Sequence, residues 1–192
     1  MDFHRFVQHA REHARSRSRA AGQKLAKGQT PTTMFITCAD SRIVTAEITG
    51  AEPGSLFELR TAGNVIPRYS LTRPSSEMAT IEFAVLQLGV SELVVCGHSH
   101  CGAVTALNGA KIDHLPAMRG WLRPGRKAPG KLADPAMRKE GQEHVRKQLQ
   151  TLLEYPFVAE KVGNGELRVH GWFYDIETGE VSACAEHAFL PL

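Results

Sequence analysis

Two short segments combine thiols, an imidazole, a carboxylate and a guanidinium at close spacing. In CADSR, Cys38, Asp40 and Arg42 occupy alternate positions, and in the later segment GHSHCGA, His98 and Cys101 lie three residues apart. Thiolate sulfur and imidazole nitrogen are ligands that Zn²⁺ prefers in proteins. We therefore predict that Cys38, His98 and Cys101 bind Zn²⁺, with water or Asp40 in the fourth position. A fourth position open to water is typical of a catalytic zinc site rather than a structural one.

The spacing of Asp40 and Arg42 suggests control over that fourth position. A guanidinium binds a carboxylate through charge-assisted, often bidentate hydrogen bonds, so it competes with a metal for the carboxylate. Held by Arg42, Asp40 leaves the position to water and can accept a hydrogen bond from it. Released, Asp40 closes the site. The alternative interpretation is a surface salt bridge at the start of a helix.

The cysteines and the histidine have other possible roles. Cys38 and Cys101 could be small buried apolar side chains, and His98 a core histidine bonded to backbone. A cysteine nucleophile activated by His98 is a further alternative, but it needs a third, orienting group that the sequence does not identify. Cys96 and Cys184 lie within predicted strands, and we interpret both as buried thiols.

The elements that must position these residues alternate between strands and helices. Apolar runs predict strands over 33–39, 55–62, 92–98 and 166–175, and a short one over 180–185 after the turn ETG. Helical patterns fall over 74–88, 103–108, 135–153 and 155–162, and residues 121–135 are expected to form a loop.

This order predicts an α/β fold. We expect a mainly parallel central sheet, with about four parallel strands plus a short antiparallel edge strand, flanked by helices. Sites in such sheets collect at the carboxyl ends of the strands. Cys38 and His98 both lie at such ends.

The length of 192 residues suits a single domain over 1–192, with 1–24 as an N-terminal helical arm. Apolar residues recur at helical spacing in this arm: Phe3, Phe6, Val7, Ala10 and Ala14. The net charge of +3 is too small to indicate a nucleic-acid partner, and no apolar run is long enough to indicate a membrane partner.

The N-terminus also bears on the compartment. It lacks the apolar core of a secretory signal, although its Arg and Ser content weakly resembles an organelle transit peptide. Four cysteines without an export signal suit a reducing compartment, so we expect a cytoplasmic protein.

The segments CADSR, GHSHCGA and HGWFYDIETG together resemble the β-class carbonic anhydrases, in their bacterial and plant-like branch. The resemblance runs from LAKGQTP through EPGSLFELRTAGNVIPRY and IEFAVLQLGV to GEVSA. It implies reversible hydration of CO₂ to bicarbonate and a proton, by attack of a zinc-bound hydroxide, with one Zn²⁺ per subunit. It also implies Cys38, His98 and Cys101 as zinc ligands, and Asp40 and Arg42 as the catalytic dyad that gates the fourth position.

The same resemblance implies a substrate pocket. Gln29 would help to hold the substrate, Phe57 would line the pocket, and the backbone N–H of Gly102 would meet the substrate. Phe83 and Ala62 occupy further pocket positions, where the family commonly has Tyr and Val. Gly102 has independent support, because free N–H groups at the start of a helix favour an anion such as bicarbonate.

The family forms dimers in which N-terminal helices embrace the partner subunit, often paired into tetramers. The apolar stripe of the arm is consistent with a homodimer or a dimer of dimers, but packing on its own domain fits the sequence equally well. Two alternative functions stay open: a hydrolase of COS or CS₂ on the same scaffold, and a non-catalytic zinc or thiol protein.

Overall fold

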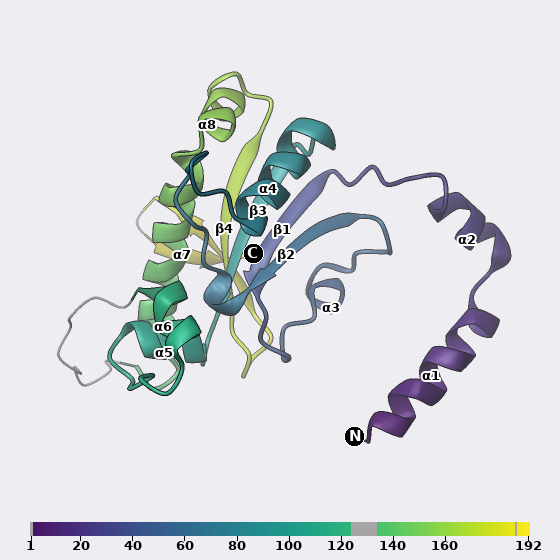
Figure 1. The fold of residues 1–192 in the computed structure, drawn as a ribbon, viewed down its shortest axis with the longest axis horizontal. Helices are drawn as coiled ribbons and strands as arrows, with labels where there is room; N and C mark the ends of the chain where they lie inside the picture. Colours follow the sequence, from purple (N-terminus) through teal and green to yellow (C-terminus); the bar gives the residue numbers. More distant parts are fainter. Residues whose placement is uncertain (1, 124–133, 187) are drawn as a thin grey trace.

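A computed structural model describes residues 2–123, 134–186 and 188–192, and its centre is a six-stranded sheet in the order β2-β1-β3-β4-β5-β6 (Figure 1). The strands are β1 Thr33–Cys38, β2 Leu56–Thr61, β3 Glu92–His98, β4 Arg168–Tyr174, β5 Val181–Ala185 and β6 Ala188–Pro191. The first four are parallel to one another, and β5 and β6 are antiparallel. The predicted mainly parallel α/β fold is thus confirmed.

One detail of the predicted sheet is wrong. Two antiparallel strands follow the parallel ones, so the edge is β6 rather than the strand after ETG. β6 spans four residues and ends at Pro191, so it is too short for a clear periodic signal. Proline is tolerated there because an edge strand can lack one N–H donor.

Two helices precede β1, and the others lie in connections between strands. They are α1 Phe3–Ser16, α2 Arg19–Leu25, α3 Thr45–Thr49, α4 Ser76–Glu82, α5 Gly102–Leu107, α6 Pro116–Leu122, α7 Arg138–Leu153 and α8 Pro156–Gly163, with a π-helical turn η2 Phe83–Gln87 and a 3₁₀ turn η1 Ala62–Asn64. The loop predicted over 121–135 is wrong at its start, because Trp121 and Leu122 end α6, which begins at Pro116. Residues 124–133 of that predicted loop lie outside the described residues.

The main core lies between one face of the sheet and helices α4, α7 and α8. Alternate residues of β1 and β3 point to this face, as the two-residue period of a strand requires. The fully buried members include Met34, Ile36, Leu93, Val95, Val145 and Leu152. This packing fixes the strands whose carboxyl ends carry the predicted ligands.

The opposite face of the sheet is covered less completely by the described residues. Phe35 and Trp172 pack edge to face there, with ring centroids 5.8 Å apart. α3 approaches this face, where Thr45 donates a hydrogen bond to Glu58 at 2.7 Å. A hollow of about 410 Å³ lies beside Phe35 and Trp172.

The arm, α1 and α2, projects away from the sheet (Figure 1). Asp2 and Ser18 cap the two helices with side-chain oxygens. None of the side chains in either helix is buried, and Phe3 and Phe6 are 72% and 57% exposed. The predicted helical arm is present, but its apolar stripe does not pack on its own domain. Among the described helices, none combines the length and apolar character needed to cross a membrane.

Candidate metal centre

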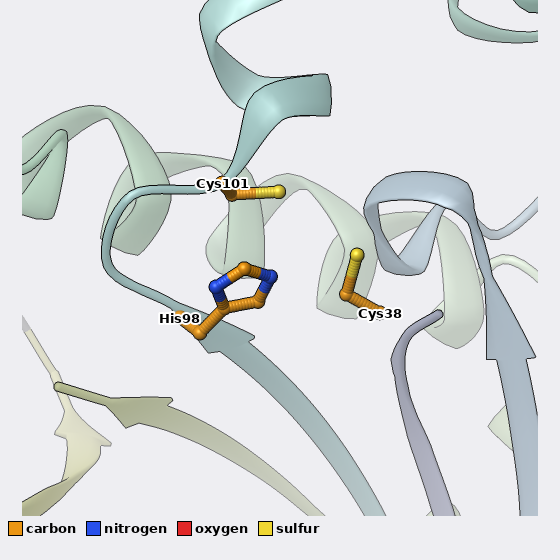
Figure 2. A group of neighbouring side chains, drawn as sticks. All are labelled: Cys38, His98 and Cys101. Atoms are coloured by element: carbon orange, nitrogen blue, oxygen red, sulfur yellow. The ribbon is translucent and has the colours of Figure 1, made fainter. Parts of the chain in front are cut away.

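Three predicted ligands meet at the carboxyl edge of the sheet (Figure 2). Cys38 ends β1, His98 ends β3, and Cys101 is the residue before α5. Their ligand atoms all lie within 4.8 Å of one another, and each residue is at most 6% exposed. A water-poor cluster of two thiols and an imidazole matches the donor set and spacing of a zinc site.

The histidine is oriented by its own backbone neighbourhood. Nδ1 of His98 lies 2.8 Å from the carbonyl oxygen of Ser99, and because a carbonyl only accepts, Nδ1 carries the hydrogen. The other ring nitrogen, Nε2, is therefore a lone-pair donor. It is buried and has no hydrogen-bond partner among the described residues. A buried, unsatisfied nitrogen aimed at two sulfurs is what a metal ion would satisfy, so these residues fit Zn²⁺.

The two thiols are electrostatically coupled. A hydrogen bond from Cys101, helped by contacts with His98 and the N–H of Gly63, holds the pKa of Cys38 well below its usual value despite burial. The same contact with Cys38, together with burial, raises the pKa of Cys101. One thiolate thus forms readily, whereas forming the second requires a cation nearby, so metal binding would release a proton.

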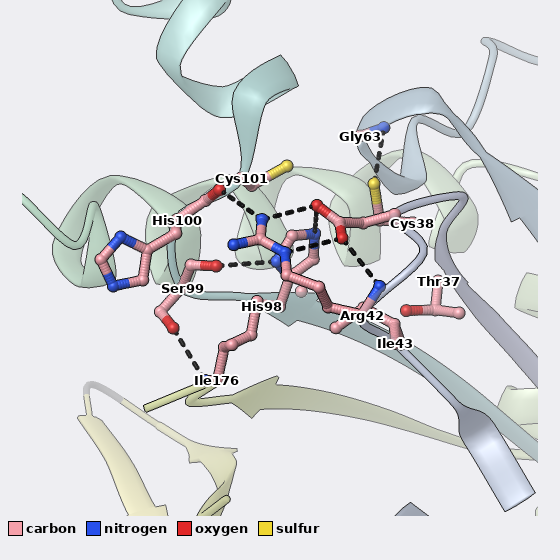
Figure 3. Close-up of polar contacts among 12 residues, drawn as sticks. Thr37, Cys38, Arg42, Ile43, Gly63, His98, Ser99, His100, Cys101 and Ile176 are labelled. Atoms are coloured by element: carbon pink, nitrogen blue, oxygen red, sulfur yellow. Dashed lines mark hydrogen bonds and ion pairs between the residues drawn. The ribbon is translucent and has the colours of Figure 1, made fainter. Parts of the chain in front are cut away.

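The carboxylate and the guanidinium form a bidentate pair (Figure 3). Arg42 Nε lies 2.9 Å from Asp40 Oδ1, and Arg42 Nη2 lies 2.7 Å from Asp40 Oδ2. These bonds hold the pKa of Asp40 well below its usual range. Asp40 Oδ2 is also 3.9 Å from His98 Nε2, so the pair borders the candidate metal position.

Comparisons with known proteins identify the chain. A family model described as carbonic anhydrase matches residues 33–181. The solved structure of the β-carbonic anhydrase CcaA superimposes with a TM-score of 0.87 at 33% sequence identity, covering 98% of this chain and 89% of that one. The chain belongs to the β-class carbonic anhydrase family.

Further relatives agree. The carbonic anhydrase of Pseudomonas aeruginosa is 42% identical over 169 residues, which cover 84% of this chain and 76% of that protein. Carbonic anhydrase 1 of Escherichia coli O157:H7 is 40% identical over 185 residues, covering 88% and 82% of the two chains. The structure of a Coccomyxa β-carbonic anhydrase in complex with acetazolamide matches with a TM-score of 0.78 at 27% identity, covering 100% and 88%.

In this carbonic anhydrase, Arg60 supports the candidate site in a way that the sequence did not reveal. Its guanidinium donates to the carbonyl oxygens of Cys38, Asp40 and Ile43 at 2.8 to 3.2 Å. Arg60 lies beside Thr37 in the register of β1 and β2. It thereby holds the chain segment that presents the first thiol and the Asp–Arg pair.

Two of the predicted pocket residues lie at the site. Ala62 directly follows β2, whose last residue pairs with Cys38, and Gly102 directly follows Cys101. The exposed backbone of Gly102 opens α5, as predicted.

The other three predicted pocket residues lie elsewhere in the same chain. Phe57 pairs with Met34 at the opposite end of β1, about 13 Å along the strands from Cys38. Phe83 packs against Phe57, with ring centroids 5.9 Å apart, and is 45% exposed. Gln29 is exposed between α2 and β1. One subunit alone does not bring Gln29, Phe57 and Phe83 to the metal centre.

The remaining cysteines do not join the cluster. Cys96 is fully buried, and burial raises its pKa to about 12. Cys184 is free and only half-buried. The buried-thiol prediction is therefore correct for Cys96 and only partly so for Cys184.

Proposed function

We propose that this protein catalyses the reversible hydration of CO₂ to bicarbonate and a proton at a zinc ion held by Cys38, His98 and Cys101. The observation that carries the proposal is the buried cluster of two thiols around an unsatisfied imidazole nitrogen, in a chain of the carbonic anhydrase family. When bound, Zn²⁺ supplies the positive charge that makes a water molecule acidic enough to become a nucleophile near neutral pH.

Asp40 and Arg42 set what occupies the fourth ligand position. Because Arg42 binds both carboxylate oxygens, Asp40 stays off the metal. The outer edge of the Asp40 carboxylate remains available to accept a hydrogen bond from water. Arg42 is itself tied to the carbonyl oxygen of His100 at 3.0 Å, which fixes the guanidinium beside the site. Withdrawal of Arg42 would free Asp40 to act as the conditional fourth ligand.

Substrate contacts come from two sources in this proposal. The N–H of Gly102, next to Cys101, donates a hydrogen bond to the bicarbonate oxygens. Gln29, Phe57 and Phe83 complete the pocket of a second subunit, since they are exposed or half-buried and far from the metal centre of their own chain. Ala62 lines the site from its own subunit.

A homodimer, or a dimer of dimers, follows from this arrangement. The unburied apolar stripe of α1 and the hollow on the sheet face beside Phe35 and Trp172 both support it. Two β-carbonic anhydrases of Sordaria macrospora are tetrameric, and the structure of one matches this chain with a TM-score of 0.79 at 28% identity, covering 96% and 97% of the two chains.

The dimer proposal predicts that charges on the arm separate the subunits. Phe3→Glu with Phe6→Glu should shift sedimentation from dimer or larger to monomer and should lower activity, because Gln29, Phe57 and Phe83 would no longer reach a second site. Leu71→Glu is a matched control at a residue that is 71% exposed outside the arm. An unchanged assembly in the arm variant would contradict this role.

A cytoplasmic location fits the four free cysteines.

The two rival functions differ from the proposal in measurable ways. A COS or CS₂ hydrolase would use the same ligands but turn over those substrates faster than CO₂. A non-catalytic zinc protein would hold a closed metal shell, whereas here Asp40 is engaged by Arg42.

Stopped-flow measurement of CO₂ hydration tests the function directly. The zinc-loaded protein should hydrate CO₂, lose that activity after removal of zinc by a chelator, and regain it when zinc is restored. COS run in parallel should be the slower substrate. Zinc-loaded protein that leaves CO₂ hydration at the buffer rate would overturn the proposal.

A further inference from the structure

The turn that follows β2 is held by side chains from two helices. Trp121 Nε1 donates to the carbonyl oxygen of Ala62 at 2.9 Å. His144 Nε2 lies 2.7 Å from the carbonyl oxygen of Gly63. The N–H of Ile66 donates to Gln148 Oε1 at 2.7 Å. This turn also touches the metal centre, because the N–H of Gly63 donates to Cys38 Sγ at 3.3 Å (Figure 3).

The contact from Trp121 differs from the other two in its chemistry. The carbonyl of Ala62 and the N–H of Gly63 belong to one peptide group, so a donor on the oxygen polarises the same amide whose hydrogen points at the sulfur. Indole, amide and sulfur thus form a continuous chain of hydrogen bonds. His144 and Gln148 bind later peptide groups of the turn and are not in line with the sulfur.

The geometry of this chain is fixed by packing. Gly63 has φ of +76°, and a Cβ built on it would lie 2.7 Å from the Cβ of Ala103, so the turn needs glycine and sits tightly against α5. The Trp121 ring packs against the apolar cluster that includes Cys38 and Cys101. Neither end of the amide is free to turn toward another partner.

We propose that Trp121 is a positioning residue for the metal centre, which acts through the Ala62–Gly63 peptide to strengthen the hydrogen bond to the Cys38 sulfur. A thiolate that accepts a stronger hydrogen bond gives less electron density to a bound metal. Such a contact offsets part of the charge that two thiolates place on one zinc ion. The inference rests on the proposed zinc-dependent function.

Cobalt substitution gives a direct readout of sulfur donation. We compare the Co²⁺-loaded parent with Co²⁺-loaded Trp121→Phe, which keeps an aromatic ring but removes the indole N–H. The thiolate-to-cobalt charge-transfer band should shift to longer wavelength in the variant, because the lone pair of a less hydrogen-bonded sulfur lies at higher energy. Activity is not needed for this measurement.

Gln148→Met is the matched control. Gln148 and His144 are both 8% exposed, and Gln148→Met removes one buried hydrogen bond to the same turn without touching the Ala62–Gly63 peptide. It should lower the thermal midpoint about as much as Trp121→Phe and leave the band in place. Coincident bands for the parent and Trp121→Phe, or an equal shift in Gln148→Met, would overturn the inference. A parent without any thiolate-to-cobalt band would instead overturn the proposed zinc site.

A second measurement needs no substitution in the turn and covers the case in which Trp121→Phe fails to fold. The chain has two tryptophans, and Trp172 packs on Phe35 at the opposite face of the sheet. In ¹⁵N-labelled protein titrated with Zn²⁺, the indole N–H resonance of Trp121 should move while that of Trp172 stays, with Trp172→Phe giving the assignment. A stationary Trp121 resonance, while the Gly63 amide moves, would contradict the chain of hydrogen bonds.

Discussion

Two carboxylate–arginine pairs with a nearby histidine lie at opposite ends of the same sheet. At the carboxyl end, Arg42 binds both oxygens of Asp40, and His98 Nε2 stays 3.9 Å from the carboxylate. At the amino end, Glu92 pairs with Arg168 and also accepts a hydrogen bond from His170 Nε2 at 2.7 Å. Both clusters combine a carboxylate, a guanidinium and an imidazole, but the histidine bonds the carboxylate at the amino end only.

The difference shows what distinguishes a metal centre from an ion-pair cluster. His170 is 40% exposed and its ring nitrogen is satisfied by Glu92, whereas the His98 side chain is fully buried and its Nε2 is unsatisfied. Each arginine donates to both oxygens of its carboxylate, so the difference lies in the imidazole: His170 Nε2 reaches its carboxylate at 2.7 Å, whereas His98 Nε2 stays 3.9 Å away and is left for another partner. The adjacent thiols supply the rest of a metal shell.

The largest expected effect comes from removing a thiol ligand. Cys101→Ser should lose zinc and lower CO₂ hydration by at least about a hundredfold, because a hydroxyl is a poor replacement for a thiolate on Zn²⁺. Elemental analysis and stopped-flow kinetics measure the two losses. Cys184→Ser, which alters a half-buried thiol outside the cluster, should change neither. Full zinc content in Cys101→Ser would refute the ligand assignment.

The second prediction compares the effect of removing Arg42 with the effect of removing Arg168. Arg42→Ala should retain zinc but lose about 10- to 100-fold in activity, since Asp40 is then free to occupy the fourth position. Arg168→Ala, the equivalent change at the other end, should leave activity unchanged within about twofold. Zinc loss in Arg42→Ala would mean that the pair has a structural rather than a gating role.

The smallest effect concerns pH and the amino-end cluster. Burial raises the pKa of Glu92, but hydrogen bonds from His170 and Arg168 outweigh it and leave the pKa below its usual value. A lowered folded-state pKa stabilises the protein above the unfolded pKa of about 4.3, and this stabilisation is lost as the pH falls through the folded pKa. Glu92→Gln should therefore cost about 0.2–1 kcal/mol at pH 7, as exposed ion pairs do, and less with falling pH.

Denaturant unfolding at several pH values measures this difference. The gap between the parent and Glu92→Gln should shrink as the pH falls below about 4.3 and close below the lowered pKa of Glu92, where both side chains are uncharged. A gap that widens on acidification would show that the cluster stabilises the protonated carboxyl instead.

Much of the site could be predicted from the sequence because each ligand ends or follows a strand with a clear apolar pattern. Parallel strands bring such ends to one edge, so Cys38 and His98 converge without any knowledge of loops. Arg60 and the N–H of Gly63 could not be predicted as contacts of the site. Their partners are backbone carbonyls and a sulfur, which depend on turn geometry rather than residue type.

Other features lay beyond the sequence for different reasons. β6 is too short to show a period, and α6 lies in a stretch rich in Pro, Gly and basic residues that resembles a loop. In the proposed dimer, the positions of Gln29, Phe57 and Phe83 relative to a metal centre depend on how subunits assemble, which patterns within one chain do not encode.

X-ray absorption at the zinc edge tests the metal centre most directly. Protein purified under reducing conditions should contain stoichiometric zinc, with two sulfur neighbours at about 2.3 Å and nitrogen or oxygen neighbours at about 2.0–2.2 Å. Zinc that is added back to Cys38→Ser should have one sulfur neighbour instead of two. Protein without stoichiometric zinc, or zinc surrounded only by nitrogen and oxygen, would contradict the assignment of Cys38, His98 and Cys101.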